Sequence, residues 1–332
     1  MEKYQQLELE FSKWNGLDPE GMVSVSSGSA ALHLALEALQ LPPGSECLVP
    51  DYTMIACARA VTLAGLKPAF VDCDDRLLMD WSEVTSRLWI PDTLGAIMCV
   101  HVYGRRMDMD KVHSMFHRIV GKDGPKPVIE DLAEAHGVKP HPRTDAACWS
   151  HYRNKIVGGE EGGSVWFHNP EHAKLARQLR NLGFTDAHDF MHIPRGHNYR
   201  LANCLAEKVL DSLMFADRNI AARRTVESWY DRYCPMEWRM PPRDVPWVYD
   251  LRVKGMGRIT QDRLVQILNG QGIAARHGFK PMTIQPEHAG YQEVCPKALE
   301  MASQVFYLPI HPGTTTEEDC KRSFEIIRHV LS

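Results

Sequence analysis

The chain has 332 residues, of which 44% are hydrophobic and 24% are charged, so it has enough apolar material for a sizeable soluble core and for two domains. Its 38 basic and 42 acidic side chains give a net charge of -4, which offers no long-range attraction to nucleic acid or to an anionic membrane. No apolar run approaches the roughly 20 residues that span a bilayer, and the N-terminal segment MEKYQQLELEFSKW lacks the apolar stretch of a secretion signal.

Short apolar runs alternate with helical patterns through the first half of the chain. The runs that we predict to be strands are CLVP (47–50), PAFVDC (68–73), GAIMCVHVYG (95–104), PVIEDL (127–132) and GSVWFHN (163–169). The segments between them with apolar residues at helical spacing are ALHLALEAL (31–39), MIACARAVTLAG (54–65) and MDKVHSMFHRIV (109–120). This alternation predicts βαβ units and a mostly parallel sheet, whose ligands bind beyond the carboxyl ends of the strands.

The segment VSVSSGSAALHLAL (23–36) combines a strand-like run, a serine-rich turn and a helix. Such a turn presents backbone N–H groups at the positive end of the helix dipole, which suits a phosphate. The alternative is that Ser27 or Ser29 simply caps the helix, because serine is a common cap.

The segment PVIEDLAEAHG (127–137) ends an apolar strand with two carboxylates, Glu130 and Asp131. A carboxylate at this edge could keep the ring nitrogen of pyridoxal phosphate (PLP) protonated, as its chemistry requires, and Asp131 is the candidate. The alternative is a helix N-cap at the end of a strand.

A single lysine, Lys155, lies in the segment CWSHYRNKIVGGEEGGSVWF (148–167). A lysine that forms a Schiff base must become a free amine, and a desolvated site lowers its pKa. Taken alone, such a lysine is more often a solvated loop lysine. Its position 24 residues after Asp131, and after the serine-rich turn, favours the PLP interpretation.

The second half of the chain begins with long helical stretches around residues 201–230, followed by a segment rich in proline and arginine. The run TQDRLVQILNGQG (260–272) predicts a helix that ends near a glycine, and TTTEEDCKRSFEIIRHVLS (314–332) predicts a capped amphipathic helix. We therefore expect a large PLP-binding α/β domain over residues 1–205 and a smaller α+β domain over 206–332.

Several segments resemble one enzyme family in the same order. SSGSAALHLAL is similar to its SGTAALHLAL, VHVYG to its VHLYG, VIEDLAEAHG to its VIEDAAQAHG, and GHNYRLAN to its G-x-N-x-R segment. WSHYRNKIVGGEEGG is similar to its SF-x-x-x-K segment. The family is that of the DegT/DnrJ/EryC1/StrS aminotransferases, PLP enzymes of fold type I that typically aminate keto-sugars attached to nucleotides.

The resemblance implies roles for particular residues. Lys155 would form the internal aldimine with PLP and move protons, and Asp131 would pair with the pyridinium nitrogen. The residues that would hold the cofactor phosphate are Ser29, Ala30 and Ser150. Glu134 stands near the cofactor's 3-hydroxyl in the family pattern. Asn198, in GHNYR, matches an asparagine that reaches the phosphate of the neighbouring subunit, which implies a homodimer with shared sites.

Met54 is a departure from the family pattern, which has a ring-stacking aromatic residue at this position. A thioether can pack on the pyridine ring, or Tyr52 could turn inward instead. His101 and Tyr103 fall near the site without an assigned role.

The resemblance further implies a ping-pong aminotransferase that takes an amino group from an amino acid, glutamate being expected, and passes it to a keto or aldehyde acceptor. A nucleotide-linked keto-sugar is the expected acceptor. Family members commonly have a few tens of residues before the equivalent of FSKWNGLDPEGMVSVSSG, including a loop that helps line the sugar site, whereas this chain starts almost directly at that equivalent. A cyclitol or a modified nucleobase or nucleoside is therefore a competing acceptor. A PLP-dependent lyase, decarboxylase or dehydratase, and a non-catalytic relative, are the alternative functions.

Other features have simpler interpretations. His113 and His117 are four residues apart and could face one zinc ion, but no acidic HExxH pattern accompanies them. Lys174, Arg177 and Arg180 could contact a substrate phosphate or form a solvated helix face. Arg276 and Lys280 lie in a segment that resembles a site-edge loop, with a purely structural role as the alternative.

The nine cysteines are scattered and include no CxxC pair, which favours buried reduced thiols over a disulfide framework. A reducing, cytoplasmic location is the corresponding expectation.

Overall fold

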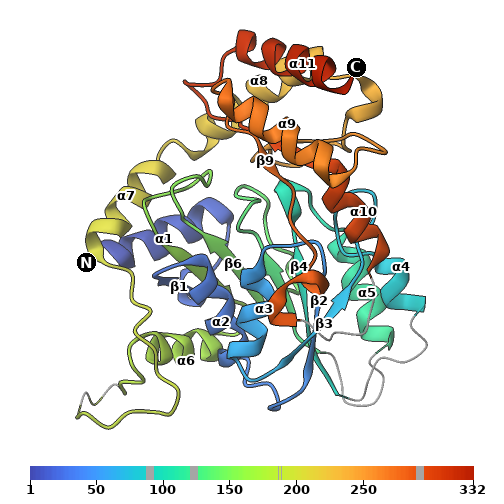
Figure 1. The fold of residues 1–332 in the computed structure, drawn as a ribbon. Helices are drawn as coiled ribbons and strands as arrows, with labels where there is room; N and C mark the ends of the chain where they lie inside the picture. Colours follow the sequence, from blue (N-terminus) through green and yellow to red (C-terminus); the bar gives the residue numbers. More distant parts are fainter. Residues whose placement is uncertain (87–92, 120–125, 186, 188, 289–294) are drawn as a thin grey trace.

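A seven-stranded sheet forms the centre of the larger part of the molecule (Figure 1). Its strands, in spatial order, are β1 (Met22–Val25), β7 (Gly163–Phe167), β6 (Ala146–Ser150), β5 (Val128–Asp131), β4 (Leu94–Val100), β2 (Glu46–Pro50) and β3 (Lys67–Val71). All strand pairs are parallel except those of β7, which runs antiparallel to both β6 and β1. The computed structural model describes residues 1–86, 93–119, 126–185, 187, 189–288 and 295–332.

Helices cover this sheet, as expected for βαβ units. They are α1 (Lys3–Asn15), α2 (Gly28–Ala38), α3 (Ile55–Leu63), α4 (Trp81–Ser86), α5 (Met109–Ile119), α6 (Pro170–Arg180) and α7 (Asn203–Leu213). Short 3₁₀ turns lie at η1 (Pro19–Gly21) and η2 (Val102–Gly104). The predicted strand over 95–104 ends at Val100. The following turn, η2, begins at Val102 and contains Tyr103 in the left-handed region at φ 53°.

The smaller part of the molecule lies above the carboxyl edge of the sheet in Figure 1. Its three-stranded antiparallel sheet has the order β8 (Tyr249–Arg252), β10 (Val305–Leu308), β9 (Arg276–His277). The helices that follow α7 are α8 (Ala216–Tyr233), α9 (Arg258–Gly270), α10 (Pro296–Gln304) and α11 (Glu317–Leu331), with short turns at η3 (Met236–Trp238), η4 (Met282–Ile284) and η5 (Pro286–His288). Thr316 caps α11 in a capping box with Asp319, as the threonine-rich start of this segment predicts. The α/β fold with a smaller α+β part is thus confirmed.

Buried apolar residues form two clusters that bear on the domain boundary. Ala206 and Val209 of α7 belong to the cluster around the large sheet. The second cluster, around the small sheet, begins with Val226 of α8. The boundary near residue 205 stays a prediction, and α7 packs with the residues that precede it.

The two parts are joined by a buried ion-pair network. Arg105, which follows η2, donates from both terminal nitrogens to the Asp250 carboxylate of β8, at 2.8 and 3.0 Å. Arg243 donates to the same carboxylate at 2.8 Å and to Glu227 at 3.0 Å. Burial alone would raise the pKa of Asp250, but the guanidinium groups of Arg105 and Arg243 outweigh it and hold this pKa below its ordinary value.

The nine cysteines are free, and all except Cys204 are buried, which confirms the prediction of reduced thiols. Across the described residues, no helix combines the length and the apolar character needed to cross a bilayer.

Candidate active site

Lys155 projects from the loop between β6 and β7 into the interior of the molecule, and its side chain is only 11% exposed. Its Nζ lies 3.6 Å from Oε1 of Glu134 and 3.9 Å from the centroid of the Trp247 ring. Glu134 follows the carboxyl end of β5, whereas Trp247 comes from the proline-rich segment just before β8. The alternative of a solvated loop lysine is therefore wrong.

The electrostatic environment of Lys155 combines burial with two carboxylates. Burial lowers the pKa of the Lys155 ammonium, and Glu134 and Asp131 partly offset that shift by stabilising the charged form. Burial also raises the pKa of Glu134, with Lys155 as the main opposing charge. A buried amine whose pKa is lowered in this way is suited to nucleophilic attack and proton transfer.

Asp131 ends β5, between Val100 of β4 and Cys148 of β6, as expected for a group at the carboxyl edge. Its oxygens accept from the Ala133 backbone N–H at 2.9 Å and from the Cys57 thiol at 3.2 Å. Burial raises the pKa of Asp131, and among the described residues no cationic group lies within ion-pair distance of this carboxylate. A protonated ring nitrogen would supply the cation that the buried carboxylate lacks.

The serine-rich turn lies against the end of β6. Ser27 caps α2, since its hydroxyl accepts from the Ala30 backbone N–H at 3.1 Å, which confirms the capping alternative for this serine. Ser29 is exposed. A Cβ on Gly28 would lie 2.7 Å from the Cβ of Ser150, so the absence of a side chain lets the helix start approach Ser150 closely. The first turn of α2 and Ser150 together form a cradle of the kind that holds a phosphate.

Tyr52 and Met54 differ in their availability to a cofactor. Tyr52 is fully buried, and its hydroxyl accepts from the Phe279 backbone N–H at 3.1 Å, so it supports the segment that leads from β9. Met54 is 52% exposed at the N-cap of α3. This geometry favours Met54 over Tyr52 as the residue free to pack on a bound ring.

His101 and Glu130, which the sequence analysis considered, form hydrogen bonds in the protein interior. His101 faces Glu130 at 2.9 Å and accepts from the Met107 backbone N–H at 3.1 Å. Glu130 also accepts from Thr144 and from the backbone of His141. Although Glu130 and Asp131 are adjacent in the sequence, Glu130 therefore stabilises the interior and Asp131 faces the site.

Trp247 is a site residue that the sequence analysis missed. Its indole N–H donates to the Asn154 carbonyl at 3.0 Å, and its own carbonyl accepts from Arg223 at 2.8 Å. Tyr307 is a second such residue, since the centroid of its ring lies 6.1 Å from that of Trp247. Burial, and to a smaller extent the Glu134 carboxylate, raise the pKa of Tyr307 to about 12. The only sequence signal was a tryptophan within a proline-rich segment, which does not specify a contact 92 residues back along the chain.

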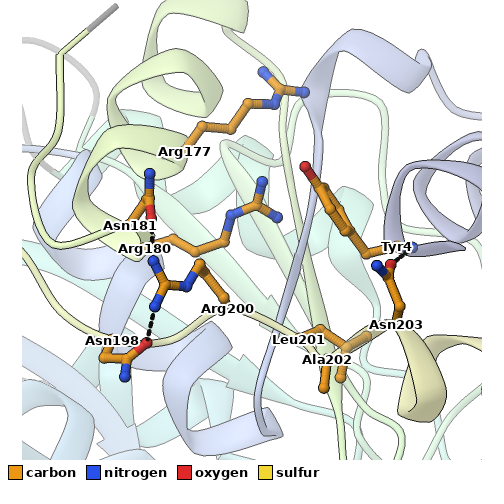
Figure 2. Close-up of a pocket in the computed structure, with 9 residues that line it drawn as sticks. All are labelled: Tyr4, Arg177, Arg180, Asn181, Asn198, Arg200, Leu201, Ala202 and Asn203. Atoms are coloured by element: carbon orange, nitrogen blue, oxygen red, sulfur yellow. Dashed lines mark hydrogen bonds between the residues drawn. The ribbon is translucent and has the colours of Figure 1, made fainter. Parts of the chain in front are cut away.

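Asn198 lies in an exposed pocket of about 480 Å³ (Figure 2). Its side-chain oxygen accepts from Arg200 at 3.0 Å, and Arg200 also donates to Asn181 at 2.5 Å. Within the described part of one chain, Asn198 makes no hydrogen bond to the Lys155 group. Its predicted role toward a neighbouring subunit stays a prediction.

The arginines of α6 have partners other than solvent. Arg177 donates to the backbone carbonyls of Glu20 and Met22, and Arg180 donates to the Ser24 carbonyl at 2.7 Å and to Glu8 at 2.8 Å. These arginines tie α6 to β1 and the segment before it, so the solvated-face interpretation does not describe them. They also line the pocket that contains Asn198 (Figure 2), and their contact with a substrate phosphate stays a prediction. Lys174 is exposed.

The remaining candidate residues lie in different surroundings. The His113 ring stacks on His141 with centroids 4.4 Å apart, whereas the His117 side chain lies outside the described residues, so the zinc hypothesis for this pair gains no support. Arg276 in β9 is near enough to Tyr307 to influence its pKa. Lys280 lines a separate pocket of about 500 Å³ beside α9 and α10.

Comparison with known proteins adds independent evidence. A model of the DegT/DnrJ/EryC1/StrS aminotransferase family matches residues 2–327. GDP-perosamine synthase of Caulobacter vibrioides is 33% identical over 325 residues, covering 93% of this chain and 85% of that protein. The crystal structure of DesV from S. venezuelae has a TM-score of 0.86 at 27% identity, over 98% of this chain and 88% of that one. The PLP form of Spr1654 from Streptococcus pneumoniae has a similar fold, with a TM-score of 0.89 at 22% identity over 99% and 92% of the two chains.

Proposed function

This chain belongs to the DegT/DnrJ/EryC1/StrS family of PLP-dependent aminotransferases, and from that premise we propose that it transfers an amino group from glutamate to a nucleotide-linked keto-sugar. The observation that carries the proposal is the buried Lys155, whose Nζ faces Glu134 at 3.6 Å beside the carboxyl edge that bears Asp131. An amine in that place has both the low exposure and the acid–base neighbours that amino transfer requires.

The residues around Lys155 fit PLP. The buried carboxylate of Asp131, which has no ion pair among the described residues and feels the charge of Lys155 only partly, would pair with the ring nitrogen. The first turn of α2, with Ser29 and the backbone at Ala30, would hold the phosphate together with Ser150, across the close approach at Gly28. Glu134 would lie near the 3-hydroxyl, and Met54 would cover a ring face.

Bound PLP supplies an electron sink that stabilises negative charge at the carbon that loses its proton. The Lys155 amine would take that proton from the donor and deliver it to the cofactor, because burial lowers its pKa while Glu134 stabilises its charged form. The ring of Trp247, 3.9 Å from Nζ, excludes water from one side of the amine and attracts its charged form. Asp131 keeps the ring nitrogen protonated by holding a negative charge beside it.

The nucleotide-linked acceptor rests on the relatives. GDP-perosamine synthase, at 33% identity over 93% of this chain, carries a nucleotide-linked sugar in its name. Because substrate preference is set by a few contacts, identity at this level supports the class of acceptor rather than one sugar.

We extend the proposal to a cytoplasmic homodimer in which Asn198 contacts the cofactor phosphate of the partner. Free cysteines suit a reducing compartment. Large apolar side chains that one chain leaves exposed include Met54, Phe190 and Met191, at 52%, 75% and 70% exposure, and a partner could cover them.

The cofactor assignment is tested by reducing the PLP-loaded enzyme with borohydride and mapping the labelled peptide. We expect the label on Lys155 alone. A label on another lysine, or no PLP binding at all, would contradict the assignment and would favour a non-catalytic relative.

The reaction type is tested by adding glutamate to the PLP-loaded enzyme without an acceptor. An aminotransferase should release one equivalent of 2-oxoglutarate per active site and convert its cofactor to the amine form. A lyase or decarboxylase should release other products or turn over repeatedly, and addition of GDP- and UDP-linked keto-sugars would then identify the acceptor class.

A further inference from the structure

A cluster of metal-ligating side chains lies away from the Lys155 site, at the junction of α2 and the GHNYR segment. His33 and Glu37 are one helical turn apart on α2, and His197 approaches them from the segment that carries Asn198. One ligand atom from each of the three residues lies within 4.8 Å of the other two. Among the described residues, this is the group of three whose donor atoms converge in this way.

The distances between the donor atoms are close to those of a metal site. Nε2 of His33 lies 3.7 Å from Oε1 of Glu37, and Nε2 of His197 lies 2.5 Å from Oε2 of Glu37. Zn²⁺ bonds of about 2.0–2.2 Å to nitrogen and oxygen in a tetrahedron place neighbouring ligand atoms about 3.4 Å apart. The His33–Glu37 distance is close to this value, and the shorter His197–Glu37 distance would have to lengthen by about 1 Å to reach it.

The cluster is buried, and one of its ring nitrogens has no hydrogen bond of ordinary geometry. The side chains of His33 and Glu37 are 4% and 5% exposed, and that of His197 is 24% exposed. Nε2 of His33 has no hydrogen-bond partner within the described part of the chain. The groups that act on this ring are the Glu37 carboxylate, 3.7 Å from Nε2, the His197 ring, the Leu63 backbone and the Tyr199 hydroxyl.

Tyr199 completes the arrangement as an outer partner. Its hydroxyl lies 3.0 Å from Nδ1 of His33, and its ring stacks on His197 with centroids 4.7 Å apart. A metal-bound histidine commonly donates its second ring N–H to such a group, which fixes the tautomer that leaves Nε2 free to bind. The tyrosine therefore orients one ligand and packs on another.

The metal-free alternative is a buried hydrogen-bonded cluster in which His197 donates to Glu37. It accounts for the 2.5 Å contact but leaves the His33 nitrogen unpaired in the interior, which costs free energy. We propose that His33, Glu37 and His197 bind one divalent transition-metal ion of the zinc type, with water at the fourth position. Two imidazoles and a carboxylate are a ligand set that zinc adopts.

Such an ion would reinforce the junction between two parts of the chain that the His197–Glu37 and Tyr199–His33 contacts now link. His197 is held by backbone bonds to Leu179 and Leu182 at the end of α6, while His33 and Glu37 belong to α2. The ion would fix the segment around residues 182–200 against the helix whose first turn is the proposed phosphate cradle. Its role is structural, and it adds to the proposed amino transfer without depending on it.

The test uses the full-length, PLP-loaded enzyme, freed of metal with a chelator and titrated with Zn²⁺ in a Cys204→Ser background that removes the one exposed thiol. We expect about one Zn²⁺ per chain. Glu37→Gln, His33→Gln and His197→Gln should each weaken binding at least about 100-fold, and Tyr199→Phe about 10-fold. His192→Gln, in the same segment but outside the cluster, is the matched control and should bind like the parent.

Two further readouts keep the result interpretable if a variant is destabilised. Co²⁺ should give the spectrum of nitrogen and oxygen ligands without a thiolate band. Zn²⁺ should slow tryptic cleavage after the exposed Arg195 in the parent and not in His197→Gln. Absence of stoichiometric Zn²⁺ binding by the folded parent, or equal binding by all three ligand variants, would overturn the proposal whatever the outcome for amino transfer.

Discussion

At the scale of single residues, the charge beside Lys155 sets the pH at which its amine is free. Burial lowers the pKa of Lys155 and the Glu134 carboxylate raises it again, so removing that carboxylate must lower the pKa further. Glu134→Gln keeps an acceptor for the Tyr103 backbone N–H, which donates to Glu134 at 2.9 Å.

We therefore expect Glu134→Gln to shift the pH dependence of PLP attachment to the apoenzyme toward lower pH. The measurement is the rate of PLP incorporation across the pH range, with the exposed Glu160→Gln as the control. A shift toward higher pH in Glu134→Gln would show that Glu134 does not stabilise the charged amine.

Residue-level prediction depended on spacing along the chain. Lys155 and Asp131 were chosen from the order of the serine-rich turn, the acid at a strand end and the lysine, and from the family resemblance. The structure places both side chains at the same edge of the sheet, while their roles toward PLP stay predictions. Trp247 was not predicted, because its contact with Lys155 depends on how the smaller part of the molecule packs against the large sheet. No periodicity in the proline-rich segment predicts that packing. The unequal roles of Glu130 and Asp131 follow from the alternation of side chains along β5, which the adjacent letters do not reveal on their own.

At the scale of elements, the start of β7 sets the position of the serine-rich turn. A Cβ on Gly163 would lie 2.3 Å from the Ser27 carbonyl oxygen and 2.8 Å from the Gly28 nitrogen, both of them backbone atoms. The turn has to move if this glycine gains a side chain.

Gly163→Ala should therefore weaken PLP binding at least about tenfold, since each 1.4 kcal/mol of lost phosphate contact is worth that factor. Equilibrium PLP binding by the apoenzyme measures this. Gly270→Ala is the matched control, because nothing lies within 4 Å of a Cβ there. Unchanged affinity in Gly163→Ala would mean that the turn does not hold the phosphate.

The Asp250 network offers a test of how the two sheets are joined. Asp250→Asn would leave Arg105 and Arg243 buried without their shared carboxylate, which typically costs about 3–5 kcal/mol. Thermal unfolding at neutral pH should show a large loss of stability in this variant, and little change in the exposed Asp262→Asn control.

The pH dependence of this effect has a definite sign. The pKa of Asp250 is below its ordinary value in the folded protein, so its contribution is fully present above the unfolded pKa of about 3.9. The contribution is lost as the pH falls below that value toward the folded pKa. The gap in stability between the parent and Asp250→Asn should thus narrow only in strong acid, and a gap that closes near pH 6 would contradict the assignment.

The elements themselves were largely predictable, with two instructive exceptions. The short strand β6 is absent from the predicted strands, because its five residues, AACWS, show neither alternation nor a long apolar run. The antiparallel direction of β7 was also not anticipated. The connection of Lys155 to β7 contains no helical pattern, and a parallel strand needs a longer crossover, so this reversal was available from the sequence.

At the scale of the whole molecule, the proposed dimer with shared sites can be tested by mixing inactive variants. Lys155→Ala and Asn198→Asp should each be inactive or severely impaired as homodimers. If Asn198 serves the partner's site, a heterodimer of the two contains one site with both residues intact.

Unfolding and refolding an equal mixture should then restore about a quarter of the parental activity, because half of the dimers are mixed and each has one working site. Refolding each variant alone provides the control. Failure of the mixture to exceed the single variants, when dimers do form, would place Asn198 outside the neighbouring site.

The contact between Lys155 and Trp247 has a consequence for biosynthesis. A nascent chain that has emerged only through β7 already contains Lys155, Asp131 and the serine-rich turn, but its lysine still lacks the indole that covers it. The surroundings of this amine are therefore complete only when the segment before β8 has folded against the loop between β6 and β7.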